Sequence, residues 1–304
     1  MAVGYSPARY TSVSDRVGQT VGLLQRRGYA LTPSRLGGLC LGGPLSEDEV
    51  RWAVAASPGL TIAEGLVVER TAMARVGEIC ARAATHESDS AAYLPMTERF
   101  VSALVAVAPF IRSVSVAGSL ASGGFRASDD VDLNLIVDDG HRHIAYVAVN
   151  VLGLLHALAH RAKPVDDLTR RPIASRLMTA NLILEVSQCH PLERQDVDMA
   201  YELLVAEPVF GLETIAGILD SNPALVDHFP QLASKRAPMQ IDRPQWRLPT
   251  SLFPTLLDGA ARRFGLAAWR YMQWTRRRHP EALARVAYVR STMRPYTLFD
   301  EPAW

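Results

Sequence analysis

The alternation of apolar and polar residues predicts a compact α-helical segment near the N-terminus that ends in a β-hairpin. Thr32 and Pro33 are a suitable N-cap and first helical residue, and Ser46 with Glu49 forms a capping box at the start of another helix. Ala63-Glu64-Gly65 separates two short β-branched runs, which is typical of a hairpin. The expected elements are helices over 17–27, from 32 and over 46–57, and strands over 60–62 and 66–68.

Three helices followed by a hairpin is the element order of a winged-helix module, and residues 15–70 fit this order after a tail of fourteen residues. We expect Val50, Val54 and the stem of Trp52 to be the buried contacts of the third helix. That helix also carries Glu47, Asp48 and Glu49 and only one basic residue, Arg51. Because these carboxylates would repel DNA phosphates, the pattern favours a protein-contact or structural role over DNA binding.

The next segment is expected to connect two domains. Residues 69–84 have helical spacing, the polar run 85–90 predicts a break, and a helix is expected again over 97–107. We therefore assign residues 71–92 to a connecting helix and linker.

From residue 93 to 195 the period switches between strand and helix, which predicts an α/β (α+β) core with a small mixed sheet. Residues 196–304 are expected to be helical throughout. The expected core elements are strands over 112–117, 131–137 and 182–186 and a helix over 144–160.

Composition narrows the setting. The chain has 304 residues, 48% hydrophobic and 21% charged, which excludes disorder over most of its length and suits about two domains. Its three cysteines form no CxxC pair and are expected to be buried thiols. The N-terminus lacks an apolar signal core, and the stretch 144–158 is interrupted by polar residues, so we expect a cytoplasmic protein without membrane association. The net charge of +1 argues against a general nucleic-acid coat.

The residues with most chemical content lie between the first two core strands. Gly118-Ser119 ends one strand, ten residues follow, and Asp130-Val131-Asp132 begins the next. Alternation along a strand directs Asp130 and Asp132 to the same face, where two carboxylates repel each other unless a cation lies between them. Mg²⁺ prefers such oxygen ligands and is often shared with substrate phosphates. Gly118 permits close approach of a ligand, and the Ser119 hydroxyl could hold phosphate oxygens.

This arrangement resembles the polymerase-beta-type nucleotidyltransferase superfamily, in which Gly-Ser, a spacer of about ten residues and Asp-hydrophobic-Asp occur in strand–loop–strand context. The resemblance implies that Asp130 and Asp132 bind Mg²⁺ and act in catalysis, and that Gly118 and Ser119 position the phosphates of a nucleoside triphosphate. We expect an arginine before the third strand to contact the triphosphate, with Arg176 preferred over Arg170 and Arg171.

Active members of that superfamily often carry a third carboxylate on a later strand, and this chain departs from the pattern. Asn181 is the positional match; its oxygen could coordinate metal, but an amide cannot act as a base. Glu185, four residues farther along, is the reserve candidate, and it reaches the metal only if the strand is offset.

A second resemblance, to bacterial proteins with this domain and a winged-helix-like N-terminus, extends over about residues 15–230. It supports the fold more than the substrate. Its matching residues are Asn181-Leu-Ile-Leu184, Ala200-Tyr-Glu-Leu203, Pro208-Val-Phe-Gly211, and Asn222 ahead of Phe229-Pro230.

The resemblance implies transfer of a nucleoside monophosphate from a triphosphate donor to an acceptor hydroxyl, with release of pyrophosphate. A small-molecule acceptor is preferred over RNA ends or protein because only one basic helix is present. Residues 264–278 combine aromatic residues and arginines, for which core packing is favoured over RNA binding, and a homodimer surface is a further possibility. The rival class is an inactive nucleotide-sensing or protein-interaction module, which the missing third carboxylate keeps open.

Overall fold

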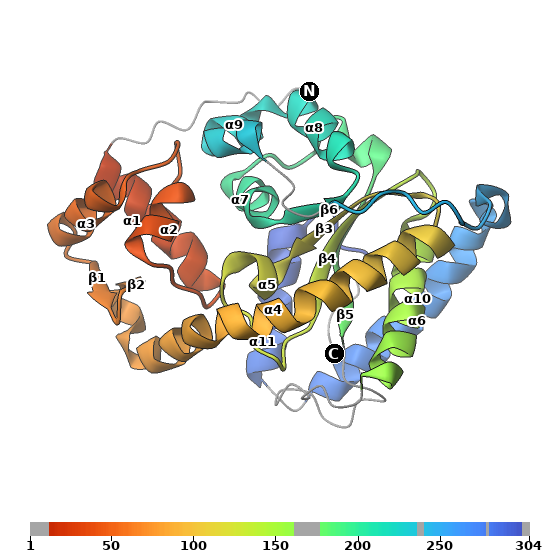
Figure 1. Ribbon diagram of the computed structural model, residues 1–304, viewed down its shortest axis with the longest axis horizontal. Helices are drawn as coiled ribbons and strands as arrows, with labels where there is room; N and C mark the ends of the chain where they lie inside the picture. The colour runs from red at the N-terminus through yellow and green to blue at the C-terminus, as the bar shows by residue number, and fades with distance from the viewer. Residues whose placement is uncertain (1–11, 161–176, 236–239, 278–279, 300–304) are drawn as a thin grey trace.

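The computed structural model describes residues 12–160, 177–235, 240–277 and 280–299 of the chain. Its N-terminal module contains three helices and an antiparallel hairpin, as predicted (Figure 1). The Thr32 cap and the Ser46–Glu49 capping box start the second and third helices where the sequence predicts them. The first helix differs from the prediction, because it begins at Val13, capped by the Ser12 side chain, four residues before the expected start and within the expected tail. The elements are α1 (Val13–Arg26), α2 (Pro33–Gly38), α3 (Glu47–Ala56), β1 (Leu60–Ala63) and β2 (Leu66–Glu69).

One contact predicted for this module is wrong. Val50 and Val54 are buried, but the Trp52 side chain lies on the solvent face of α3 and is 64% exposed. Position 52 lies two residues from each buried valine, so it is turned about 200° from each of them around a helix with 3.6 residues per turn.

The predicted interruption of helical structure at residues 85–90 is also wrong. After the short 3₁₀ helix η1 (Arg70–Arg75), a single helix α4 (Val76–Val107) runs through the polar segment 85–90 and across the molecule in Figure 1. The polar residues of this segment do not interrupt α4, because His86 and Asp89 accept hydrogen bonds from a loop packed against the helix.

The central sheet has the strand order β5-β4-β3-β6. Strand β4 pairs antiparallel with β3 and parallel with β5, and β6 pairs antiparallel with β3 at the edge. The first three strands match the predictions, although β5 starts four residues earlier than expected. Strand β6 contradicts the prediction that the region after residue 196 is entirely helical. The strands are β3 (Ile111–Ala117), β4 (Val131–Val137), β5 (Met178–Glu185) and β6 (Glu207–Phe210).

The two faces of the sheet contact different helices. Val131, Leu133 and Leu135 of β4 share a core with Phe100 of α4 and Val149 of α6. On the opposite face, Ile136 and the β5 leucines share a core with α7, α8, α9 and the N-terminal module. Because side chains alternate along β4, Asp132 and Asn134 lie on this second face. The helices are α6 (Arg142–Ala159), α7 (Val197–Val205), α8 (Leu212–Ser221) and α9 (Pro223–His228), with 3₁₀ turns η2 (Val186–Cys189) and η3 (Pro230–Ser234).

The C-terminal region contains η4 (Thr250–Leu252), α10 (Leu256–Arg276) and α11 (Pro280–Met293). α10 packs along α6, and the two helices lie side by side in Figure 1. The prediction that the aromatic residues of 264–278 pack in the core is wrong for three of them: Phe264 is 59% exposed, and Tyr271 and Trp274 also face solvent. In the described part of the chain, α6 is long and apolar enough to cross a membrane by length and composition, and a third of that window is buried against the protein.

Candidate functional site

Gly118 and Asp132 are in direct contact where β3 ends. Gly118 starts the short helix α5 (Gly118–Ser122) with φ of +60°, and a Cβ there would lie 2.0 Å from Asp132 Oδ2. Only glycine therefore fits this position, because any side chain would displace the carboxylate and strain the backbone. Ser119 follows directly and is buried, and the Ser122 hydroxyl donates to the Gly118 carbonyl at 2.7 Å. The structure thus brings together three of the predicted site residues.

Asp132 is held by its neighbours on both sides in the sheet. It pairs with Ala117 of β3 and with Thr179 of β5, and the Thr179 hydroxyl donates to Asp132 Oδ1 at 2.9 Å. Asp130 directly precedes β4, and both carboxylates are half-buried. The predicted pair therefore lies at the end of the sheet from which α5 emerges.

Asn181, the predicted third position, is part of a buried amide–carboxylate network. The pairing of β4 with β5 shifts by one residue between Leu133 and Asn134, and this irregularity lets Asn181 share a face with Asn134. Asn181 Nδ2 donates to Asn134 Oδ1 at 2.9 Å and to Glu202 Oε1 at 3.0 Å, and Asn134 Nδ2 donates to the same Glu202 oxygen at 3.0 Å. With Nδ2 engaged in this way, Oδ1 is the Asn181 atom suited to a cation.

Glu202 was not predicted as a site residue. It lies on α7 and is only 6% exposed. The sequence signal was its place in the Ala200–Leu203 segment, which gave no indication of its partners. Because a buried carboxylate needs donors, the two asparagine amides explain how it is tolerated there.

Glu185, the reserve candidate for the third ligand, is contradicted by its position. It pairs with Val137 at the far end of β4, five residues from Asp132, which is roughly 17 Å along a strand. Its carboxylate accepts the Gly140 amide at 3.0 Å, and Glu185 also caps η2. The strand offset needed to bring it to the predicted metal site does not occur.

In the described residues no cluster of three or more His, Cys, Asp or Glu side chains could hold a metal ion. Asp130 and Asp132 together offer two carboxylates, one fewer than such a cluster requires. Such a pair suits Mg²⁺ when phosphate oxygens and water complete the octahedron, because the ion is commonly held by one or two carboxylates and a bound phosphate.

The loop between α5 and β4 is fixed by one face of α4. Arg82 donates through Nε to the Gly124 carbonyl at 3.0 Å and pairs with Asp129 at 2.8 Å. Four residues farther along α4, His86 Nδ1 accepts the Phe125 amide at 3.2 Å. Asp89 Oδ2, seven residues from Arg82, accepts the Ala127 amide at 3.0 Å, and the Tyr93 hydroxyl, eleven residues from Arg82, donates to the Ala127 carbonyl at 2.7 Å. This spacing places all four residues on one helical face. The approach to Asp130 is therefore rigidly held.

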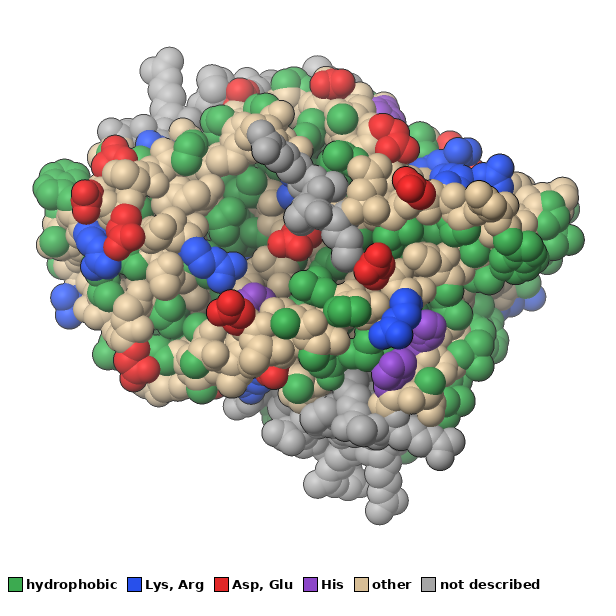
Figure 2. Space-filling model, in the orientation of Figure 1, with side chains coloured by type: hydrophobic (Ala, Val, Ile, Leu, Met, Phe, Trp, Pro, Cys, Tyr) green, Lys and Arg blue, Asp and Glu red, His purple; other side chains and the backbone are tan. Residues whose placement is uncertain are grey.

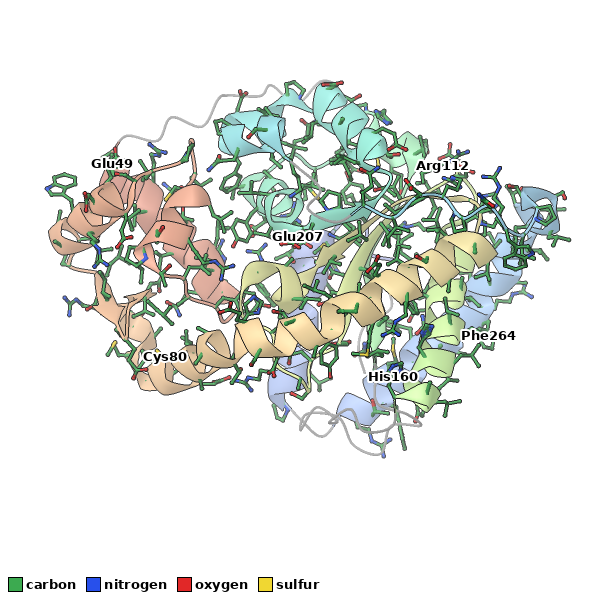
Figure 3. The ribbon with its side chains drawn as sticks, in the orientation of Figure 1. Glu49, Cys80, Arg112, His160, Glu207 and Phe264 are labelled. Atoms are coloured by element: carbon green, nitrogen blue, oxygen red, sulfur yellow. The ribbon has the colours of Figure 1, made fainter. Side chains whose placement is uncertain are left out.

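A carboxylate, Glu207, lies at a hollow in the face of the molecule, and the charges of Lys235 and Arg35 act on it. Figure 2 shows the hollow in the face of the molecule, with charged side chains of both signs around it, and Figure 3 places Glu207 above α5 at this point. Burial raises the pKa of Glu207 above its ordinary value, although nearby Lys235 and Arg35 oppose the rise. Burial also lowers the pKa of Lys235 to about 8, and its Nζ donates to the Leu204 carbonyl at 2.6 Å.

The arginines expected at the triphosphate, Arg170, Arg171 and Arg176, lie outside the described residues. Their role stays a prediction. His156 and His160, one turn apart on α6, belong to no candidate metal cluster in the described part of the chain.

Comparison of the chain with protein-family models, with curated proteins and with solved structures finds no match.

Proposed function

We propose that the protein is a Mg²⁺-dependent nucleotidyltransferase that moves a nucleoside monophosphate from a triphosphate to an acceptor hydroxyl. The observation that carries the proposal is the contact between the Gly118 turn and Asp132. Gly118 leads into the buried Ser119 and lies directly against the Asp132 carboxylate, and the second carboxylate, Asp130, is two residues away. These groups offer ligands for both phosphate and metal in one place.

Asp130 and Asp132 would hold the ion, and Thr179 keeps Asp132 in one orientation through its hydrogen bond. When bound, Mg²⁺ offsets the negative charge that develops on the transferring phosphoryl group. Ser119 and the α5 backbone would hold the terminal phosphates. The acceptor oxygen forms a bond to the α-phosphorus as the bond to the bridging oxygen breaks, and pyrophosphate leaves in line.

The proton of the acceptor hydroxyl must pass to a base other than Asn181. An amide does not take up a proton at neutral pH, and the Asn181 nitrogen already donates to Glu202 and Asn134. Asn181 would therefore contribute an oxygen ligand only.

A small polar acceptor is preferred over RNA or protein. Arg35, Glu207 and Lys235 give the hollow both signs of charge, whereas a nucleic-acid groove needs an excess of cations along its length. The N-terminal helices and hairpin are proposed to be a winged-helix-like contact module. Its third helix presents Glu47, Asp48 and Glu49 to solvent, which disfavours DNA.

The second candidate is a module that binds nucleotide without turning it over. The specific observation is that β5 carries an amide, Asn181, where the resemblance implies a third carboxylate, and that Glu185 lies at the other end of the sheet. A phosphate and metal site lacking an acceptor-side carboxylate could sense a nucleotide or present it to a partner protein.

The first experiment is thermal unfolding of the purified chain with ATP, GTP, CTP or UTP, each with and without Mg²⁺. A ligand that binds only the folded state adds RT ln(1 + [L]/Kd), about 2.7 kcal/mol at a hundredfold excess over Kd. We expect a Mg²⁺-dependent rise in Tm with at least one nucleotide, and its loss in the double variant Asp130→Asn with Asp132→Asn.

The matched control removes two exposed carboxylates of α8 and α9, Asp220→Asn with Asp227→Asn, and should keep the rise. A shift that survives in the Asp130/Asp132 variant would contradict the metal assignment. Pyrophosphate release with hydroxylated acceptors then separates the enzyme from the sensing module, since a module that only binds gives the Tm rise without turnover.

A further inference from the structure

A cation from the N-terminal module lies beside the proposed donor site. A Cβ placed on Gly123, the residue that ends α5, would lie 3.2 Å from Arg35 Nη1 and 3.3 Å from Nη2. The Arg35 guanidinium therefore lies beside the C-terminal end of the short helix α5, which begins with Gly118 and Ser119. This helix is five residues long, about 7.5 Å at 1.5 Å per residue, which is within the reach of a triphosphate chain.

This guanidinium is available for a ligand. Arg35 is exposed, and no hydrogen bond or ion pair of its guanidinium is found within the described part of the chain. Other arginines of the module differ in this respect: Arg16 donates to the Leu41 carbonyl, Arg27 pairs with Asp198 and Arg51 pairs with Glu47. The backbone of α2 nevertheless holds Arg35 in place, since Thr32 caps the helix through the Arg35 amide.

The charges that act on Arg35 come from several elements. The Arg35 charge acts to lower the pKa of Glu207 on β6, against the larger effect of burial. It also lowers the pKa of His86 on α4, after the larger effect of burial. Neither forms an ion pair with it. A cation held near the hollow without a protein carboxylate in contact is suited to bidentate binding of phosphate oxygens.

We propose that Arg35 binds a phosphate of the nucleoside triphosphate, so that the N-terminal module completes the donor site of the core. The inference rests on the proposed function and deepens it. On this arrangement the triphosphate extends from the two aspartates along α5 to Arg35, and the donor is enclosed only when the module is docked.

The test is the affinity of Mg²⁺ with ATP, GTP, CTP and UTP, measured by calorimetry for the full chain and two variants. Arg35→Gln removes the charge and keeps a polar side chain, and Arg51→Gln makes the same change on α3 of the same module. We expect Arg35→Gln to weaken the binding of the preferred nucleotide at least tenfold, Arg35→Lys to weaken it less, and Arg51→Gln to leave it within twofold.

Three results would overturn the inference, and they are distinguishable. Unchanged affinity in Arg35→Gln would show that Arg35 does not contact the donor while the proposed function stands. A second result is that ligand-free Arg35→Gln has a lower Tm and that Arg35→Lys recovers affinity only to the extent that it recovers Tm. This would show that Arg35 holds the module on the core and does not bind the donor. No Mg²⁺-dependent binding by the unchanged chain would contradict the donor site itself, and the inference with it.

Discussion

At the scale of single residues, the site depends on carboxylates whose environments differ. Asp132 meets a threonine hydroxyl and a glycine turn at the end of the sheet from which α5 emerges, whereas Glu202 is enclosed and accepts two amides. Only the first is in a position to meet a ligand. Glu202 instead keeps Asn134 and Asn181 in fixed orientations by accepting a hydrogen bond from each amide.

Glu202→Ala should reduce the free energy of unfolding by roughly 2–3 kcal/mol. The change leaves the Asn134 and Asn181 amide hydrogens without their shared acceptor in a buried place, and each unsatisfied polar group costs about 1–3 kcal/mol. Urea unfolding measures the difference. Glu202→Gln, which keeps an acceptor oxygen, should lose less, and equal losses in the two variants would contradict the proposed network.

His86 should make stability depend on pH. Its Nδ1 accepts the Phe125 amide, so the neutral ring is the form that the folded protein holds, and burial followed by the Arg35 charge lowers its pKa. The unfolded chain, with an ordinary histidine pKa near 6.5, then binds more protons in acid. The contribution is complete above about pH 6.5 and is lost as the pH falls below this value.

His86→Asn keeps an acceptor but does not titrate, so it should flatten the fall in unfolding free energy between about pH 6.5 and 5. His156 and His228 also have lowered pKa values and keep part of the slope. His190→Asn, the same exchange at an exposed position, is the control for the substitution itself. If the unfolding free energy of His86→Asn falls with pH as steeply as that of the unchanged chain, protonation of His86 does not affect stability.

At the scale of elements, local signals were sufficient where an element is set by its own residues. The caps of α2 and α3 and the strands β3 and β4 follow from short patterns, and so does the expectation that Gly118 and Asp132 belong to one site, because the two strands are neighbours in the chain. The edge strand β6 was missed because it is four residues long, contains Pro208 and pairs on one side only.

The polar segment of α4 could not be interpreted from the sequence alone. Polar residues at 85–90 resemble a linker when their partners are unknown, and the partners lie about forty residues away in the loop before β4. The same limit applies to Glu202 and Arg35. Each acquires its place in the site through packing between elements that are distant in the chain.

At the scale of the whole molecule, the N-terminal module and the core are joined at the loop that leads to Asp130. The module shares a hydrophobic core with α7–α9, and the Gly42 amide donates to the His228 carbonyl at 2.8 Å. The ring of Tyr29 lies against Gly124, where a Cβ would be 2.3 Å from Tyr29 Cδ1. There is no room for a side chain between the module and the loop.

Gly124→Ala should therefore loosen the docking of the module. Its backbone does not require glycine, so the expected loss of about 1–3 kcal/mol in unfolding free energy comes from overpacking against Tyr29. Gly59→Ala is the matched control, because nothing lies within 4 Å of a Cβ there, and it should leave stability nearly unchanged. Thermal and urea unfolding measure both variants.

Gly124→Ala also tests whether the N-terminal module takes part in nucleotide binding or the core binds its donor alone. If the module completes the donor site, Gly124→Ala should also weaken the binding of Mg²⁺ with nucleotide, and Tyr29→Leu in the same chain should recover part of both losses by making room for the methyl group. A Gly124→Ala protein that loses stability but binds nucleotide as tightly as the Gly59→Ala control would show that the core binds its donor alone. The module would then be a contact surface for another partner, joined to the site only through the packing of α4 and the loop.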